Sequence, residues 1–197
     1  MVRSPHKLIP ADFTPVPSLG TSCEVSAVPE FAPDLDAVAI LVGTGTDLTG
    51  VVGMGADALA AAGFDASAGS SLVVARDGHP LVLVGVGALD ELDADSLRDA
   101  AAAAARATAK KGGRIGIDVP AVGVGARTAG QVITEGALLA RYRYAVLKAE
   151  PEEVALEVLQ FRVAGADATA LAAGIATALV TVRAATVARD LANTPPG

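Results

Sequence analysis

The sequence predicts a three-layer α/β domain, a mixed sheet flanked by helices, and three observations lead to this class. Short apolar runs alternate with helical segments along most of the chain. Apolar residues make up 52% of the chain and are mainly Ala, Val and Leu, with no Trp, and such small aliphatic side chains suit strands that are covered by helices. A chain of 197 residues is long enough for one such domain and short for two.

The first third of the chain is expected to begin with a tail and continue into two strands. Residues 1–21 are rich in proline and lack an apolar period, which is typical of an arm laid over the surface, and His6 there has no partner cluster. Strands are expected at 22–28 and 37–43, separated by a proline-bounded loop. The second strand is apolar on both faces and therefore belongs in the middle of a sheet.

The next segments predict a short helix and a hairpin. The helix is expected over 51–62. Strands at 72–75 and 81–87 are joined through Asp77-Gly78, a pair that favours tight turns, so the two strands are expected to pair as a hairpin with His79 exposed at the turn. The run VLVGVG at the end of the hairpin lacks the third glycine of a dinucleotide-binding loop, so we interpret it as a plain strand end.

The second half of the chain predicts alternating helices and strands. The acidic residues 90–95 are expected to cap a helix over 96–111 rather than to hold a cation, because carboxylates accept hydrogen bonds from free N–H groups at a helix start. The strand 114–119 would run parallel to 81–87 through a crossover. The remaining elements are expected as a helix over 127–141, a strand over 155–163 and a long final helix.

The final helix is expected to begin after Asp167 and to be mostly buried. Apolar residues recur every three or four positions, at Leu171, Ile175, Leu179 or Val180, Val182, Thr186 or Val187, and Leu191. A helix of roughly 25 residues would be roughly 38 Å long at 1.5 Å per residue. Its composition favours a core helix over a membrane span, since Thr, Gly and Arg183 interrupt the apolar run.

Charge and cysteine content narrow the possible functions. The formal net charge of −7 disfavours nucleic acid, whose backbone attracts clustered Lys and Arg. The single Cys23 cannot form an intrachain disulfide and fits a reducing cytoplasm. It is expected to be a buried, inert thiol. The N-terminus lacks the pattern of a secretory signal.

Two stretches, in order and spacing, resemble a known enzyme family. Residues 135–144 read EGALLARYRY, and residues 188–196 read ARDLANTPP, after the hairpin that ends in VLVGVG. Together they resemble the N-terminal domain of the leucyl aminopeptidase (cytosol aminopeptidase) family, in which the ARDL-N-P segment leads into the catalytic domain. The resemblance implies a fold of the macro-domain class and a structural role for Glu135, beside which no basic or metal partner is expected.

The resemblance also implies what the parent enzyme would need. The family removes N-terminal residues from peptides with two divalent metals, zinc or manganese, which acidify a shared water. It assembles as hexamers. Its NTDAEGR-type ligand run is not found in these residues, where Asn193-Thr194 is followed by prolines. We therefore expect no catalytic, cofactor-binding or metal residue in this segment, an inactive fragment, and the catalytic domain of the same polypeptide as its partner.

The expected division is a tail at 1–21, an α/β domain at 22–166, and a helix with a junction at 167–197. Two alternatives to a scaffolding and oligomerisation domain stay open. A stand-alone module could bind a nucleotide such as ADP-ribose at the glycine-rich loops 43–46 and 122–126. A DNA-binding regulatory domain would use the basic clusters Arg106-Lys110-Lys111-Arg114 and Arg141-Arg143-Lys148, which we interpret as solvated element ends. A cytoplasmic location with no membrane contact is expected.

Overall fold

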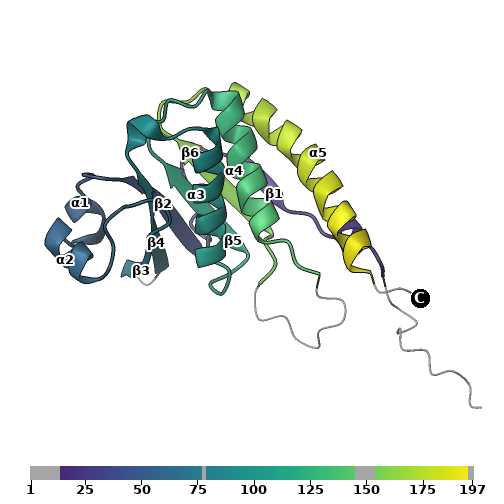
Figure 1. Ribbon diagram of the computed structural model, residues 1–197, viewed down its shortest axis with the longest axis horizontal. Helices are drawn as coiled ribbons and strands as arrows, with labels where there is room; N and C mark the ends of the chain where they lie inside the picture. Colours follow the sequence, from purple (N-terminus) through teal and green to yellow (C-terminus); the bar gives the residue numbers. More distant parts are fainter. Residues whose placement is uncertain (1–13, 77–78, 145–153, 195–197) are drawn as a thin grey trace, which may run out of the picture.

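A computed structural model describes residues 14–76, 79–144 and 154–194 of the chain as one mixed six-stranded sheet with helices (Figure 1). The strands are β1 Glu24–Ala27, β2 Ala37–Gly43, β3 Ser71–Arg76, β4 His79–Gly87, β5 Arg114–Val119 and β6 Val158–Val163. The helices are α1 Thr49–Val52, α2 Ala56–Ala61, α3 Ala94–Ala107, α4 Ala126–Ala140 and α5 Ala168–Asn193, with short 3-10 turns η1 Pro17–Leu19 and η2 Leu89–Glu91.

The sheet has the strand order β1-β6-β5-β2-β4-β3. All neighbours are parallel except β3, which pairs antiparallel with β4 as the expected hairpin. The strand β5 runs parallel to β4, as expected, but β2 lies between the two and pairs with both. The prediction that β2 belongs in the middle of the sheet is therefore confirmed, and the mixed α/β class with it.

The two faces of the sheet are covered differently. Helices α3, α4 and α5 lie side by side over one face (Figure 1), where the larger core cluster gathers around side chains such as Leu97, Ile117 and Phe161. The other face carries the smaller cluster around Leu83 and Phe64, which packs on the segment that contains α1 and α2. The loop between β1 and β2 also lies against that face, where Ala32 donates a hydrogen bond to Gln160 of β6. These coverings give the expected three layers.

Several sequence predictions differ from the structure in detail. The helix expected over 51–62 is two short helices, because Gly53 adopts a left-handed backbone that ends α1. The helix expected over 96–111 is α3, which starts earlier and ends at Ala107. Asp93 caps it by accepting from the N–H of Ser96, and that backbone bond lowers the pKa of Asp93 below its usual value. The capping interpretation is thus confirmed for Asp93, whereas Asp90 and Glu91 lie in η2.

The final helix begins after Asp167 as predicted, but the prediction that it is mostly buried is wrong. Asp167 accepts hydrogen bonds from the N–H groups of Thr169 and Ala170. The buried stripe of α5 comprises Leu171, Gly174, Ile175, Ala178 and Val182, with Asp190 near the end of the helix. In contrast, Val180 is 73% exposed and Leu191 is 59% exposed. The reason is that α5 is the outermost helix of its layer (Figure 1) and packs mainly on α4.

By length and composition alone, α5 is also one helix that could cross a membrane. Only 28% of its most apolar 18-residue window is buried. In this fold the helix has a packed inner face, and a Cβ built at Gly174 would overlap the carbonyl oxygen of Arg127 in α4. The inner face of α5 is therefore closely packed against α4.

Candidate functional site

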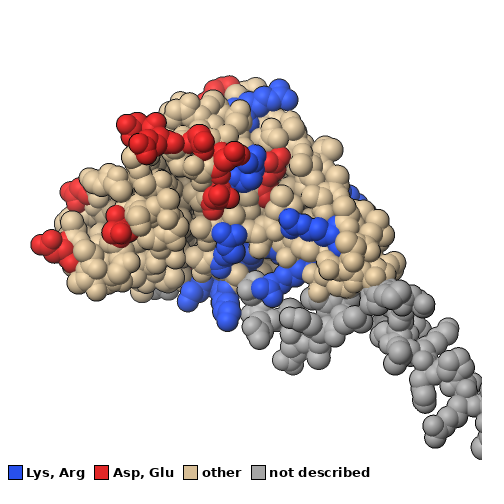
Figure 2. All heavy atoms as spheres, viewed as in Figure 1, with Lys and Arg blue, Asp and Glu red and all other residues tan. Residues whose placement is uncertain are grey.

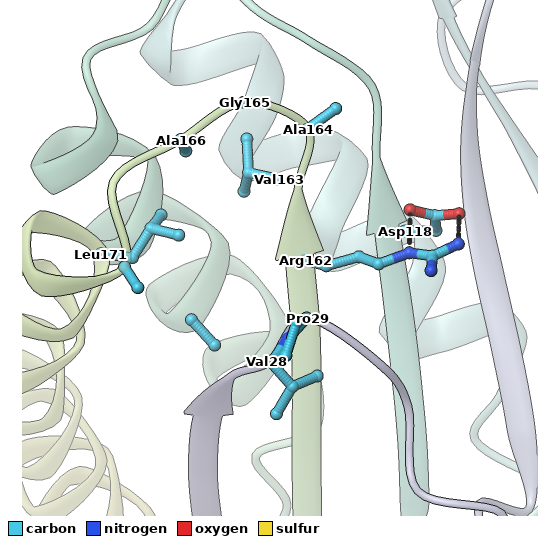
Figure 3. A pocket seen from close by; sticks show the side chains of 11 residues that line it. Val28, Pro29, Asp118, Arg162, Val163, Ala164, Gly165, Ala166 and Leu171 are labelled. Atoms are coloured by element: carbon cyan, nitrogen blue, oxygen red, sulfur yellow. Dashed lines mark hydrogen bonds and ion pairs between the residues drawn. The ribbon is translucent and has the colours of Figure 1, made fainter.

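The carboxyl ends of β1, β5 and β6 surround a cavity of about 580 Å³, at the end of the sheet where α/β folds often bind ligands. Its wall is mostly apolar, with Val28 and Pro29 after β1, Val163 at the end of β6, and Leu171 from the first turn of α5 (Figure 3). Gly165 has a left-handed backbone, with φ of 72°, that turns the chain from β6 toward α5.

The charged groups of this cavity are Asp118 and Arg162. Figure 3 shows Arg162 extending away from Leu171 toward Asp118, with which it forms two hydrogen bonds of 2.8 and 2.7 Å. This paired geometry raises the pKa of Arg162 above its already high value, mainly through the hydrogen bond to Asp118. The guanidinium also lies 5.0 Å from the ring centroid of Phe31, so both its charge and its flat face have partners within the chain.

This arrangement is not suited to catalysis by the residues present. A nucleophile needs a base within hydrogen-bond reach, and among the described residues the lining contains no Ser, Cys, Thr, His or Lys. The N–H groups at the start of α5 are already capped by Asp167. The cavity therefore offers an apolar hollow beside a satisfied ion pair. Sequence reasoning missed both residues, because Asp118 and Arg162 are 44 positions apart and meet only when β5 and β6 pair.

The two glycine-rich loops proposed for a nucleotide do not line this cavity. In the first loop, the N–H of Thr44 donates to Gly87 over 2.9 Å and the N–H of Thr46 donates to Gly43 over 3.2 Å. Those donors are therefore occupied within the fold. The second loop leads into α4, whose start at Gly125 has no side-chain cap. The nucleotide-binding alternative stays a prediction at that second loop.

The dinucleotide interpretation of VLVGVG is excluded by packing. A Cβ built at Gly85 would overlap the carbonyl oxygen of Ser67, and the N–H of Gly85 donates to Ser70 over 2.8 Å. Gly87 has a left-handed backbone with φ of 76°. These glycines are needed because the loop before β3 lies directly against β4. The interpretation as a plain strand end is confirmed.

The two basic clusters considered for DNA do not form a continuous stripe. Arg114 pairs with Asp34 over 2.8 Å, and Arg141 is buried. Lys148 lies outside the described residues. Figure 2 shows several Lys and Arg side chains at the lower middle of this face and others higher up beside acidic side chains. Arg106, Lys110 and Lys111 are exposed at and beyond the end of α3, where cations complement the helix dipole, as the sequence interpretation expected.

Glu135 is a structural residue with a basic partner, so the expectation that no such partner lies nearby is wrong. It is 6% exposed and accepts from Arg98 Nε over 3.3 Å and from Gln131 Nε2 over 2.8 Å. Arg98 comes from α3, 37 positions away, and is therefore invisible in the local sequence. The contacts join α3 to α4.

The two stretches that suggested the family meet in space. Tyr142, from EGALLARYRY, donates its hydroxyl to the Asp190 carboxylate of ARDLANTPP over 2.9 Å. Asn193 contacts the same hydroxyl at 3.4 Å, and the Arg189 guanidinium lies 5.4 Å from the Tyr142 ring centroid. Arg141 donates to the carbonyl oxygens of three residues, Ala105, Gly112 and Val154. These stretches therefore hold helix ends together.

Cys23 lies just before β1 and is half-buried, so the expectation of a buried thiol is only partly met. Burial raises the pKa of its thiol to about 12, so the thiol stays protonated at neutral pH, as expected of an unreactive cysteine. Within residues 14–76, 79–144 and 154–194, no group of three or more His, Cys, Asp or Glu side chains could hold a metal ion. The described residues thus do not fit the paired metal centre that the resemblance implies for the parent enzyme.

Protein families and curated proteins that are similar to this chain point to one family. The sequence profile described as the cytosol aminopeptidase family, N-terminal domain, matches residues 43–151. A probable cytosol aminopeptidase of Microcystis aeruginosa is 36% identical over 140 residues, which are 67% of this chain and 27% of that protein. A probable cytosol aminopeptidase of Chlorobium luteolum is 33% identical over 157 residues, 67% of this chain and 31% of the relative.

Solved structures show the same fold. The bottromycin maturation enzyme BotP has a TM-score of 0.61 and 30% identity, over 82% of this chain and 33% of BotP. A second BotP structure, in complex with Mn, has a TM-score of 0.59. A tomato leucine aminopeptidase mutant has a TM-score of 0.70 at 18% identity, over 88% of this chain and 39% of that chain, and this likeness concerns the fold.

Proposed function

Because this chain belongs to the cytosol aminopeptidase family through its N-terminal domain, we propose that it is the non-catalytic scaffolding and oligomerisation domain of a leucyl-aminopeptidase-like metalloenzyme. The parent would remove N-terminal residues from peptides with two divalent metals, zinc or manganese, in the cytoplasm. Its catalytic domain would be the partner of this domain in the same polypeptide, and the parent would be a hexamer. The metals would supply an acidified water when bound.

The share of each relative that is matched supports this proposal. The chain spans 27% of the Microcystis relative and 33% of BotP. The residues that do chemistry in a metallopeptidase would then lie in the unmatched remainder. The division into a tail at 1–21, an α/β domain at 22–166 and a helical junction at 167–197 belongs to the same proposal.

The observation that carries the scaffolding role is the outer face of α5. We define this face as Ala176, Val180, Arg183, Ala184 and Leu191, all exposed. Val180 and Leu191 are among the most exposed large apolar side chains of the described residues. Apolar side chains aligned along a helix and left open to water favour a protein contact. The proposed occupant is the catalytic domain of the same polypeptide.

Charge argues for that occupant over a second copy of α5. The helix contains a single acidic residue, Asp190, which is 0% exposed. Within the described part of the chain, the guanidinium of Arg183 on the outer face makes no ion pair. Pairing two copies of this face would bring cations together without a carboxylate to balance them. A different surface that supplies a carboxylate beside apolar residues would fit better.

The first experiment is to measure the intact mass of the protein in its source cell by immunoblot against this domain. The proposal expects a band well above 19.5 kDa, as large as the full-length relatives. A band at 19.5 kDa alone would contradict the proposal and favour a free-standing binding module. Lysis in denaturant with protease inhibitors controls for cleavage during preparation.

A second experiment tests the expected inactivity of the segment. The purified chain is incubated with a leucine arylamide and added manganese or zinc, and release of the arylamine is followed by absorbance. We expect no release above a heat-denatured control. Release that scales with protein concentration and survives repurification would overturn the assignment as non-catalytic.

A further inference from the structure

The described part of the N-terminal arm is fastened to the far end of the chain. The backbone N–H of Ser18, in η1, donates to Asp190 Oδ2 over 2.8 Å, across 172 positions of sequence. The hydroxyl of Thr194 shares its single donor hydrogen between the carbonyl oxygen of Pro15, at 3.0 Å, and the carbonyl oxygen of Asp190, at 2.9 Å. On the helix side, Asp190 lies in the last turn of α5 and Thr194 is its C-cap residue. The arm therefore lies across the point where α5 ends.

Asp190 is the centre of this attachment. Its carboxylate is 0% exposed, and it accepts from two donors, the Ser18 N–H through Oδ2 and the Tyr142 hydroxyl through Oδ1. A buried carboxylate must be satisfied by hydrogen bonds, since removing it from water is costly. Partial burial first, and then the bond to Asp190, raise the pKa of Tyr142, so its hydroxyl stays a donor. The arm supplies one of the two bonds.

The arm also forms one wall of a second cavity, of about 560 Å³. Pro17, Ser18 and Cys23 line it from the arm side, and Leu138, Leu156 and Val182 line it from the body of the domain. The arm wall around Ser18 belongs to a short segment whose described hydrogen bonds to the rest of the fold go to Asp190 and Thr194, whereas Cys23, next to β1, packs against the main core cluster. Local opening of such a segment needs far less free energy than global unfolding.

We propose that residues 15–18 are a detachable strap, latched by the buried Asp190 carboxylate, that closes this cavity over Cys23 and fixes the last turn of α5. The aspartate of the ARDLANTPP stretch then has a role within the chain, since it binds the chain's own N-terminal arm. The inference concerns contacts inside this domain and does not depend on the proposed parent enzyme.

The test uses Cys23 as the reporter, because it is the single cysteine of the chain. Its labelling by a maleimide at pH 8 is followed by intact mass. Burial raises the pKa of Cys23 to about 12, so the thiol should react slowly while the strap is in place. When the strap detaches, the pKa of the thiol should fall toward its ordinary value, and the fraction of reactive thiolate should increase. We expect Asp190→Ala to raise the labelling rate at least about tenfold, because both donors lose their acceptor.

Matched variants separate the latch from general destabilisation. Tyr142→Phe removes the other donor to Asp190 and leaves the Ser18 bond, so labelling should stay within about twofold of the parent chain. Ser18→Pro removes the backbone N–H that reaches Asp190 and should raise labelling, whereas Ser18→Ala keeps that N–H and should not. Circular dichroism and thermal midpoints establish that each variant is folded at the labelling temperature.

The outcomes decide the proposal in either direction. Fast labelling in Asp190→Ala and Ser18→Pro, with slow labelling in Tyr142→Phe and Ser18→Ala, supports the strap. Unchanged labelling in folded Ser18→Pro overturns it, as does equal acceleration in Ser18→Ala. If Asp190→Ala does not fold, the Ser18 pair still decides, with Thr194→Val as a third variant that removes the Pro15 bond and should accelerate labelling.

Discussion

The inner and outer faces of α5 belong to one helix and have opposite environments. On the inner face, Leu171, Ile175 and Val182 are at most 8% exposed, and Gly174 lets the backbone of α4 approach closely. On the outer face, Val180 is 73% exposed and Leu191 is 59% exposed. The outer face nevertheless also carries large aliphatic side chains.

This difference shows what holds the helix in place. Large apolar side chains occur on both faces, so they do not by themselves decide which side is packed. The glycines do: a Cβ built at Gly130 of α4 would overlap the carbonyl oxygen of Leu171, and one at Gly174 would overlap that of Arg127. The inner face is therefore specified by small residues where two helix backbones meet.

The largest expected effect on stability comes from placing a larger side chain in the contact between α4 and α5. Gly174→Val should lower the free energy of unfolding by about 3 kcal/mol or more, since an overpacked side chain would push α5 away from α4. Urea denaturation measures this. Ala176→Val, exposed on the outer face, is the control and should change stability by less than about 1 kcal/mol. Equal losses in the two variants would mean that the helix contact is not closely packed.

A cavity on the inner face should come next in size. Ile175→Ala removes a side chain that is 6% exposed and should destabilise by about 2–4 kcal/mol. Leu191→Ala truncates an aliphatic side chain on the outer face of the same helix and should cost under about 1 kcal/mol. A Leu191→Ala loss as large as that of Ile175→Ala would show that the outer face is packed in solution, for example in a dimer, which sedimentation would detect.

The two faces of α5 also show how much of the fold could be predicted from the sequence. The strand and helix order was predicted, because the period of apolar residues and cap residues such as Asp167 and Asp93 are local signals. The exposure of Val180 was not predicted, because apolar periodicity predicts a helix but does not predict which parts of the protein cover each of its faces. The pairs Asp118–Arg162 and Arg98–Glu135 were also missed, since each joins two elements that come together only in the tertiary fold.

A signal for Asp190 was present and not used. It is the one carboxylate in an otherwise acid-free helix. The residues around it indicate a family resemblance but not a contact. Its partners, Ser18 and Tyr142, lie 172 and 48 positions away, so the sequence could indicate that the residue was unusual and not what it binds. The candidate cavity at the strand ends was likewise beyond prediction, because its wall comes from three strands and α5.

A smaller effect is expected at the start of α5, which both faces share. Asp167→Ala should cost about 1 kcal/mol, because the N–H groups of Thr169 and Ala170 lose their acceptor. Asp167→Asn keeps a side-chain oxygen and should stay within a few tenths of a kcal/mol of the parent chain. Thermal unfolding at neutral pH compares the two. A larger loss with Asn than with Ala would contradict the capping role.

The smallest effect on the isolated domain, and the sharpest test of the outer face, is expected from Val180→Glu. A carboxylate at a position that is 73% exposed should change the free energy of unfolding by no more than about 0.5 kcal/mol. In the proposed parent enzyme the same change would bury a charge in the contact with the catalytic domain, so size-exclusion chromatography should show weakened assembly and arylamide hydrolysis should fall at least about tenfold. Thr169→Glu, exposed at the first turn of α5, introduces the same charge outside the defined face and should leave assembly intact. If Val180→Glu were instead to destabilise the isolated domain by as much as Ile175→Ala, the outer face would already be covered there, and the difference between the two faces of α5 would not describe the protein in solution.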